Sequence, residues 1–294
     1  MSLQPEDIFI IAGQSNAANY VNCADCNGHS TPQYQLKHPQ DVLVWNLEKG
    51  QKVCDKYPSW CNRQWELWQP ASAPLPSFAA WGTSNCDSVW PRVGDMLFEQ
   101  TGRKIGFVFF PWGGTSVSQW VQTANNLFIA FILAAQQLLP TYASKIRAIL
   151  WFQGETDAAT GMSTSVYAGY LTQLIQESRQ SGLYPTVPWL VSRTTLGAPD
   201  SNRQAILDAQ NQVIRTTPNT FSGPDTDELA PLSERYEQLI ENRCTNQRVH
   251  MTEIGAEHVA AGWVDSIMAA NVMTQVTQKH QTRCCFVVSK SCRI

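Results

Sequence analysis

Residues 8–19 read Ile8-Phe9-Ile10-Ile11-Ala12-Gly13-Gln14-Ser15-Asn16-Ala17-Ala18-Asn19 and place an apolar run directly before a small, polar segment. An apolar run of this length, rich in β-branched and aromatic residues, predicts a fully buried strand of a parallel sheet. Ligands of open α/β sheets collect beyond the carboxyl ends of such strands, so Ser15 lies where chemistry is expected. The same residues also fit a polar turn in which Ser15 or Asn16 caps a helix.

Two later stretches have the same form. Residues 105–110 are apolar and precede Pro111-Trp112-Gly113-Gly114-Thr115-Ser116, and residues 146–152 precede Gln153-Gly154-Glu155-Thr156-Asp157. Near the end of the chain, Arg248-Val249-His250-Met251-Thr252 places a histidine just before a helical pattern. The sequence therefore predicts polar clusters at the ends of neighbouring strands, with a histidine supplied from elsewhere.

The order of these motifs, G-Q-S-N, G-G-T-S, Q-G-E-T-D and V-H-x-T, resembles the SGNH hydrolase superfamily. More narrowly it resembles the carbohydrate esterase branch that contains sialate O-acetylesterases and acetyl xylan esterases, and the resemblance spans roughly residues 8 to 270. It implies an SGNH (flavodoxin-like) fold and a serine esterase that removes O-acetyl groups from carbohydrates through an acyl-serine intermediate. It also implies that no metal or cofactor takes part.

Periodicity and turn residues predict the remaining elements. The predictions are strands at 41–45 and 187–192, helices at 88–100, 127–139, 164–179, 201–214, 229–240 and 254–276, and a loop at 222–227. The chain alternates strand and helix about five times, which predicts a three-layer α/β/α sandwich around a central parallel sheet of about five strands.

The 294 residues carry no break in composition, so we predict a single domain over 1–294 with an insertion at about 20–90 and a tail at about 278–294. Six of the eleven tryptophans lie in the insertion, namely Trp45, Trp60, Trp65, Trp68, Trp81 and Trp90. Indole rings near a strand end suit stacking on sugar rings. The alternative is a satellite core beneath a long loop.

The charge is low, with 15% charged residues and a net charge of −3. Without a run of lysine and arginine to follow a phosphate backbone, nucleic acid is not an expected partner. No apolar run reaches the roughly 18 residues that span a bilayer, so we expect no membrane partner either.

The nine cysteines are grouped in loops: Cys23, Cys26, Cys54, Cys61, Cys86, Cys244, Cys284, Cys285 and Cys292. Grouped cysteines in a chain of low charge predict disulfides and an exported protein whose signal sequence has been removed. Because nine is odd, one thiol stays free or pairs between chains. Cys23-Ala24-Asp25-Cys26 is also compatible with half a zinc site or a redox motif, although a second C-x-x-C is absent.

A serine hydroxyl needs a base to become a nucleophile. Of the five histidines, His250 alone is expected in a loop entering a helix, and the family resemblance makes it the base. The resemblance assigns the oxyanion donors to the Ser15 N–H, the Gly114 N–H and the Gln153 side chain. The alternatives are a helix-end histidine, a tight glycine turn and a polar residue that closes a strand.

The acid of the triad departs from the superfamily pattern. In the SGNH hydrolases, which this chain resembles, the acid is generally an aspartate three residues before the histidine. This sequence has Gln247 at that position. Glutamine can orient an imidazole but cannot stabilise its charged form. The substitutes are Glu155, which we favour, together with Asp157, Asp225 and Asp227. The alternative for Glu155 is that it braces its loop or caps the next helix.

We expect an acetylated carbohydrate as the substrate, bound by Gln14, Asn16, Trp112 and Asp225. Because the usual acid is missing, a carbohydrate-binding protein that kept this fold but lost turnover is the competing hypothesis. A metal or redox protein that uses Cys23 and Cys26 is the third.

Overall fold

The computed structural model describes residues 3–21, 33–48, 64–71, 75, 86–121, 127, 141–180, 184–240 and 243–273. Within these residues the main sheet has seven strands in the order β3-β2-β4-β1-β5-β6-β7. The strands are β1 (Asp7–Gly13), β2 (Val42–Glu48), β3 (Gln64–Pro70), β4 (Ile105–Phe109), β5 (Ile146–Phe152), β6 (Trp189–Arg193) and β7 (Thr220–Asp225). All neighbours pair in parallel except β2 and β3, which are antiparallel.

Strand β1 lies at the centre of the sheet, between β4 and β5. Ile8 and Ile10 face one side of the sheet and Phe9 and Ile11 the other, and all four are fully buried. A strand covered on both faces needs apolar residues at successive positions, which explains why the uninterrupted run at residues 8–11 takes this place.

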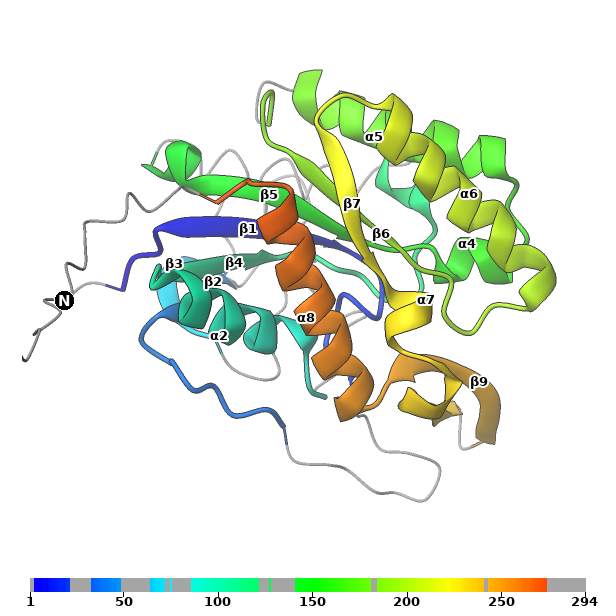
Figure 1. The fold of residues 1–294 in the computed structure, drawn as a ribbon, viewed down its shortest axis with the longest axis horizontal. Coiled ribbons are helices and arrows are strands. Elements are labelled where there is room, and N and C mark those ends of the chain that lie inside the picture. The colour runs from blue at the N-terminus through cyan, green and yellow to red at the C-terminus, as the bar shows by residue number, and fades with distance from the viewer. Residues whose placement is uncertain are drawn as a thin grey trace, which may run out of the picture.

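Helices cover both faces of the sheet (Figure 1). The helices are α2 (Val89–Thr101), α4 (Glu155–Ala159), α5 (Thr164–Gln180), α6 (Asp200–Thr216), α7 (Thr226–Leu229) and α8 (Glu253–Ala269), with 3-10 turns η2 (Val117–Trp120), η3 (Ala143–Lys145) and η4 (Leu232–Glu234). Helices α2 and α8 pack together on one face, and α4, α5 and α6 lie on the other. The three-layer α/β fold predicted from the sequence is confirmed.

A second, two-stranded sheet follows α7. Strands β8 (Arg235–Ile240) and β9 (Arg243–Met251) form an antiparallel hairpin, and β9 leads directly into α8. The Thr252 side chain caps α8 by accepting a hydrogen bond from the Gly255 N–H. His250 therefore lies near the end of a strand, which corrects the expectation that it stands in a loop.

Three expectations about elements are wrong. The sheet has seven strands rather than about five, because β3 and β7 extend it at its two edges. The loop predicted at 222–227 is largely β7, in which Pro224 is tolerated because an edge strand leaves one side unpaired. The helix predicted at 229–240 is replaced by η4 and β8, since pairing with β9 overrides the helical pattern.

The helices predicted at 88–100, 164–179 and 201–214 are confirmed with small shifts as α2, α5 and α6, and the one predicted at 254–276 is present as the shorter α8. Helix α8 ends at Ala269 rather than at residue 276, and Asn271 follows with a φ of 51°, in the left-handed region that interrupts a helix. Apart from Leu127, the helix predicted at 127–139 lies outside the described residues or in their gaps, as does the tail at 278–294.

The tryptophans of the insertion that can be placed belong to the core. Trp45 and Trp68 are buried, and their rings pack at a centroid distance of 5.1 Å. Trp90 is fully buried against Trp263 at 5.3 Å. These three do not form a sugar-stacking surface; Trp60, Trp81 and the side chain of Trp65 lie outside what the structure describes.

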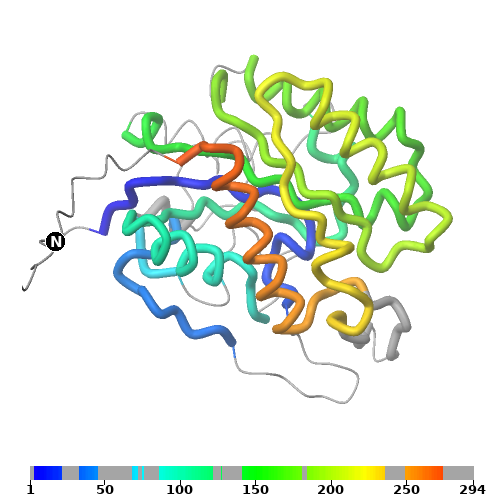
Figure 2. Tube along the Cα trace, viewed as in Figure 1, coloured from blue at the N-terminus to red at the C-terminus, as the bar shows by residue number. Residues whose placement is uncertain are grey.

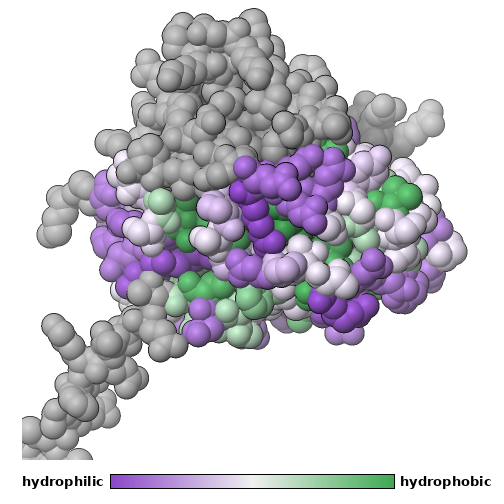
Figure 3. Space-filling view, turned by 90° about the horizontal axis from the view of Figure 1, so that it is seen from above, coloured by the Kyte–Doolittle hydropathy of each residue, from purple (hydrophilic) through white to green (hydrophobic). Residues whose placement is uncertain are grey.

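On the face shown in Figure 3, polar side chains cover much of the described surface and apolar ones form small, separate patches. Among the residues that the structure describes, no helix combines the length and the apolar character needed to cross a bilayer. The single-domain organisation over 1–294 stays a prediction.

Candidate active site

The turn after β1 starts at a glycine that allows unusually close packing. Gly13 has a φ of +145°, and a Cβ on it would lie 2.0 Å from the Phe152 carbonyl oxygen at the end of β5. The next N–H, of Gln14, donates to that same oxygen at 3.0 Å, and the Trp112 N–H donates to the Gly13 carbonyl at 2.8 Å. The loops after β1, β4 and β5 are thereby held together at the carboxyl edge of the sheet.

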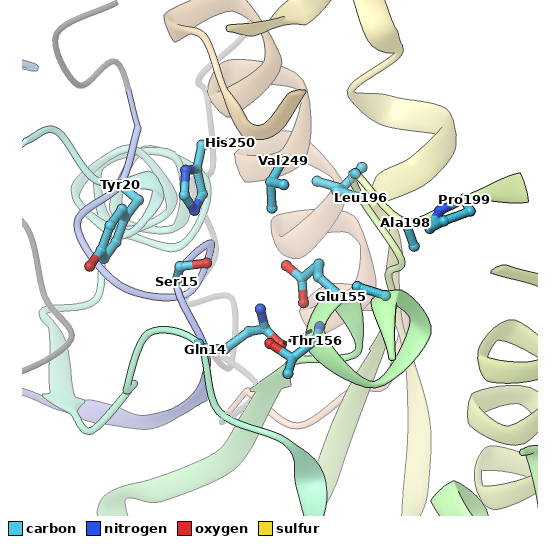
Figure 4. Close-up of a pocket in the computed structure, with 13 residues that line it drawn as sticks. Gln14, Ser15, Tyr20, Glu155, Thr156, Leu196, Ala198, Pro199, Val249 and His250 are labelled. Atoms are coloured by element: carbon cyan, nitrogen blue, oxygen red, sulfur yellow. Dashed lines mark hydrogen bonds between the residues drawn. The ribbon is translucent and has the colours of Figure 1, made fainter. Parts of the chain in front are cut away.

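A pocket of about 680 Å³ opens at this edge (Figure 4). Of the residues predicted for the site, it is lined by Gln14, Ser15, Gly114, Glu155 and His250. These residues come from three loops of the sheet and from the end of β9. The structure thus brings together the nucleophile, the base and one oxyanion donor that the sequence predicts.

Ser15 and His250 lie next to each other at one end of the pocket, and both are buried (Figure 4). Burial lowers the pKa of the His250 imidazole to about 4, so at neutral pH the ring is uncharged, as a base must be. Within the described part of the chain no hydrogen bond joins Ser15 to His250. Such bonds often close only when substrate is bound.

Tyr20 also belongs to the site, although nothing in the sequence pointed to it. Its ring stacks on the His250 imidazole with a centroid distance of 4.8 Å and an interplanar angle of 30°, and it lines the pocket. Tyr20 follows Ser15 by five positions in the same loop, but no local pattern indicates stacking on a residue 230 positions away. The contact restrains the orientation of the imidazole.

The predicted backbone donors of the oxyanion hole have room for a ligand. Gly114 is exposed, has a φ of +72° and would place a Cβ with nothing within 4 Å. Neither its N–H nor that of Ser15 donates a hydrogen bond to another described residue. Both groups can therefore bind a negatively charged oxygen in the pocket.

Gln153 departs from the expected role of an oxyanion donor. It is fully buried, and its Nε2 already donates to Gln14 Oε1 at 3.1 Å, to the Thr115 carbonyl at 2.9 Å and to Asp157 Oδ2 at 2.5 Å. Its Oε1 accepts from the Tyr167 hydroxyl at 3.0 Å. With two amide hydrogens and three acceptors, this side chain braces the loops and does not line the pocket.

Glu155 reaches the histidine only through intermediates. Its Oε1 accepts from Asn16 Nδ2 at 2.6 Å, and the same Nδ2 donates to the Val249 carbonyl at 3.1 Å, one residue before His250. Figure 2 shows the blue turn after β1 beside the orange chain that enters α8. In the described structure no hydrogen bond or ion pair joins Glu155 to His250. Burial raises the pKa of the Glu155 carboxyl to about 7.

The other acids considered for the triad have structural partners. Asp157 binds the Ser116 hydroxyl at 2.5 Å as well as Gln153. Asp225 pairs with Arg193 at 3.0 Å and caps α7, and Asp227 pairs with Arg203 at 2.9 Å. None of them bonds to His250 among the described residues, and the Gln247 side chain lies outside them.

Only one of the four predicted substrate-binding residues lines the pocket. Of Gln14, Asn16, Trp112 and Asp225, only Gln14 lines the pocket, and its Oε1 accepts from the Thr156 N–H at 3.1 Å. Asn16 and Asp225 are engaged as described above, and Trp112 packs against the core on the α5 side of the sheet. The opposite wall of the pocket comes from residues 196–199, which the sequence did not suggest.

No metal site emerges from the described residues, since none of them form a cluster of three or more histidine, cysteine, aspartate or glutamate side chains able to hold an ion. Cys23 and Cys26 lie outside those residues. Cys86 is disulfide-bonded.

A match to a known protein family covers most of the chain, including most of the loops that line the pocket. Residues 5–235 match the carbohydrate esterases described as sialic acid-specific acetylesterases. The chain belongs to this family. Membership in the carbohydrate esterase family supports carbohydrate acetylesterase activity, with an acetylated carbohydrate as substrate. The match includes the loops of Ser15, Gly114 and Glu155 and ends before His250. No curated protein matches the sequence.

Solved structures share the fold of this carbohydrate esterase. An Arabidopsis thaliana protein has a TM-score of 0.64 at 17% identity, with 90% of this chain and 99% of that chain covered. A carbohydrate acetylesterase from Xanthomonas citri has a TM-score of 0.57 at 17% identity, covering 90% of this chain and 56% of that chain. NanS has a TM-score of 0.58 at 12% identity, covering 90% and 98%.

Proposed function

We propose that the protein is a serine esterase that removes O-acetyl groups from carbohydrates through an acyl-serine intermediate. The observation that carries the proposal is the convergence of Ser15, His250 and Gly114 on one pocket at the carboxyl edge of the sheet. A hydroxyl, an uncharged imidazole and two N–H groups not bonded within the described protein are the groups that ester hydrolysis by serine requires.

The reaction follows from these positions. Ser15 Oγ attacks the acetyl carbonyl carbon while His250 takes the hydroxyl proton, and the Ser15 and Gly114 N–H groups bind the resulting oxyanion. The intermediate collapses, the C–O bond to the sugar breaks, and His250 returns its proton to the sugar oxygen. His250 then takes a proton from water as the water oxygen attacks the acetyl-serine carbonyl carbon, and it returns that proton to Ser15 Oγ as the C–Oγ bond breaks. Acetic acid leaves and ionises to acetate.

Positioning of the base falls to two neighbours. Tyr20 restrains the ring by stacking, and Glu155 holds the backbone of residue 249 through Asn16. Glu155 thus takes the place of the missing aspartate indirectly, as a positioning residue. Gln153 supports the loop that carries Gly114 by donating a hydrogen bond to the Thr115 carbonyl.

The substrate class within the family is an acetylated sialic acid or a xylan-type glycan. We further propose that the protein is exported, since the cysteines are grouped and Cys86 is disulfide-bonded. Disulfide-bonded proteins are typical of oxidising compartments.

The test is the Ser15→Ala variant, assayed with a chromogenic acetyl ester and with acetylated xylo-oligosaccharides. We expect the variant to lose at least about a thousandfold in kcat, because triad nucleophiles contribute several orders of magnitude. Ser165→Ala, which removes an exposed hydroxyl on α5, is the matched control and should retain full activity. Activity of Ser15→Ala within about threefold of the wild type would overturn the mechanism. A wild type that binds glycans without turnover would favour the binding-protein hypothesis.

A further inference from the structure

The pocket is larger than an acetyl ester requires. Its volume is about 680 Å³, within the range of pockets that enclose whole small-molecule ligands. A methyl group is similar in size to a water molecule, which occupies about 30 Å³ in the liquid. Room therefore remains beside the reacting carbon after the acetyl group is placed.

The groups around Ser15 determine which part of the ester fills that room. In the tetrahedral intermediate, the carbonyl carbon bears Ser15 Oγ, the oxyanion, the leaving oxygen and the acyl chain. The oxyanion must point to the N–H groups of Ser15 and Gly114. The leaving oxygen must lie near His250, which protonates it. The acyl chain therefore points away from both, toward the remaining wall.

Beyond Glu155 and Thr156, the far side of the pocket is lined by apolar side chains. Figure 4 shows Leu196, Ala198 and Pro199 on the side of the pocket opposite Tyr20, beyond Val249. Ala159, at the end of α4, also lines the pocket. Leu196 is buried, Ala198 is half-buried, and Ala159 and Pro199 are exposed at the mouth of the pocket. The two alanines leave space that larger residues would fill, and the apolar surface favours contact with methylene groups.

We infer that the wall formed by Ala159, Leu196, Ala198 and Pro199 binds the acyl chain and allows the enzyme to hydrolyse esters of propionyl and butyryl groups as well as acetyl. The inference rests on the proposed function, because it uses the positions of the nucleophile, base and oxyanion donors. It adds an activity on acyl groups longer than the one the family description names.

The experiment compares kcat/KM for the 4-nitrophenyl esters of acetate, propionate and butyrate, which share one leaving group. For the wild type we expect the butyrate value to lie within about tenfold of the acetate value. Ala198→Phe should lower the ratio of butyrate to acetate by at least about tenfold, because a blocked site for methylene groups costs about 10- to 200-fold. Ala159→Phe adds the same ring to the wall at the end of α4, and it replaces the first variant in the test if that variant does not fold.

Val166→Phe is the matched control, since it adds the same ring at an exposed position on α5 and should leave the ratio unchanged. A wild type that hydrolyses acetate but rejects butyrate by a thousandfold or more would overturn the inference. Folded wall variants that keep the wild-type ratio of butyrate to acetate hydrolysis would also overturn it. The same holds if the variants lose hydrolysis of both esters equally and bind xylo-oligosaccharides more weakly, because the wall would then bind the sugar. Failure of the proposed function can be told apart from failure of this inference, because in that case the wild type would hydrolyse none of the three esters.

Discussion

Asn16 joins three segments that lie far apart in the sequence. Its Nδ2 binds Glu155, 139 positions away, and the Val249 carbonyl, 233 positions away. The amide is nearly inaccessible to solvent, so both bonds form away from water, where an unmade bond costs about 1–3 kcal/mol. The side chain that follows Ser15 thereby fixes the end of the strand that carries His250.

Glu155 makes the stability of the protein depend on pH. Its pKa is raised from 4.5 to about 7 in the folded state. The stability gained by burying the protonated form is therefore complete below pH 4.5 and is lost as the pH rises through about 7. Relative to Glu155→Gln, which does not titrate, the wild-type free energy of unfolding should fall by about 3 kcal/mol between about pH 4 and pH 8.

Urea unfolding of both proteins across this range measures the difference. Because all other groups titrate in both proteins, the comparison isolates position 155. A difference that does not change with pH would show that Glu155 keeps an ordinary pKa in the folded protein.

At the scale of elements, the loop between β6 and α6 supports the end of β9. Gly197 in this loop has a φ of +79°, and a Cβ on it would lie 2.3 Å from Val249 Cγ2 and 3.0 Å from Val249 Cα. Only glycine allows this approach, and Val249 directly precedes His250. The loop at residues 196–199, which lines the pocket, thus also positions the end of the strand that carries His250.

Gly197→Ala should therefore destabilise the protein and slow turnover. We expect a loss of about 2–4 kcal/mol in the free energy of unfolding, from left-handed backbone strain together with the steric clash, and a lower kcat from displacement of His250. Gly102→Ala is the matched control. Gly102 has a φ of +65° but nothing within 4 Å of its Cβ position, so it incurs the backbone strain alone, about 1–2 kcal/mol.

Unfolding curves and acetyl ester kinetics of the two variants separate the effects. Equal losses of stability and unchanged kcat in both would mean that contact with Val249 does not position His250.

At the scale of the whole molecule, the site lies where the two halves of the sheet meet. Strands β4 and β5 flank β1, and the chain reaches the two edges on either side of this centre. Such a change in strand order opens a crevice at the carboxyl edge, which is where the pocket lies. The helices on both faces bury the sheet and leave this edge for chemistry.

The cysteines provide a test of how the whole chain is held together. Cys86 is disulfide-bonded, and nine cysteines allow at most four bridges. We expect the mass of the denatured protein to show more alkylated cysteines after reduction than before it. Reduction should also lower the free energy of unfolding by about 2–4 kcal/mol for each bridge that closes a long loop. Nine cysteines alkylated without reduction would contradict both the bridges and the proposed export.

The sequence by itself determined the buried strands and the polar clusters at their ends. Apolar runs such as residues 8–11 encode burial locally, because each residue of a central strand must face one covered side or the other. The motifs around Ser15, Gly114 and His250 were therefore readable without coordinates. The helices with clear periodicity, such as α5, were readable for the same reason.

Only the tertiary structure decided which polar groups are engaged and which face the pocket. The Gln153 amide donates to three acceptors, Glu155 binds Asn16 instead of His250, and Tyr20 stacks on the His250 ring. Strand β8 likewise forms because β9 lies beside it. Hydrogen bonds, ring contacts and strand pairing depend on partners that the fold brings from distant parts of the chain. A local pattern of residues does not identify those partners.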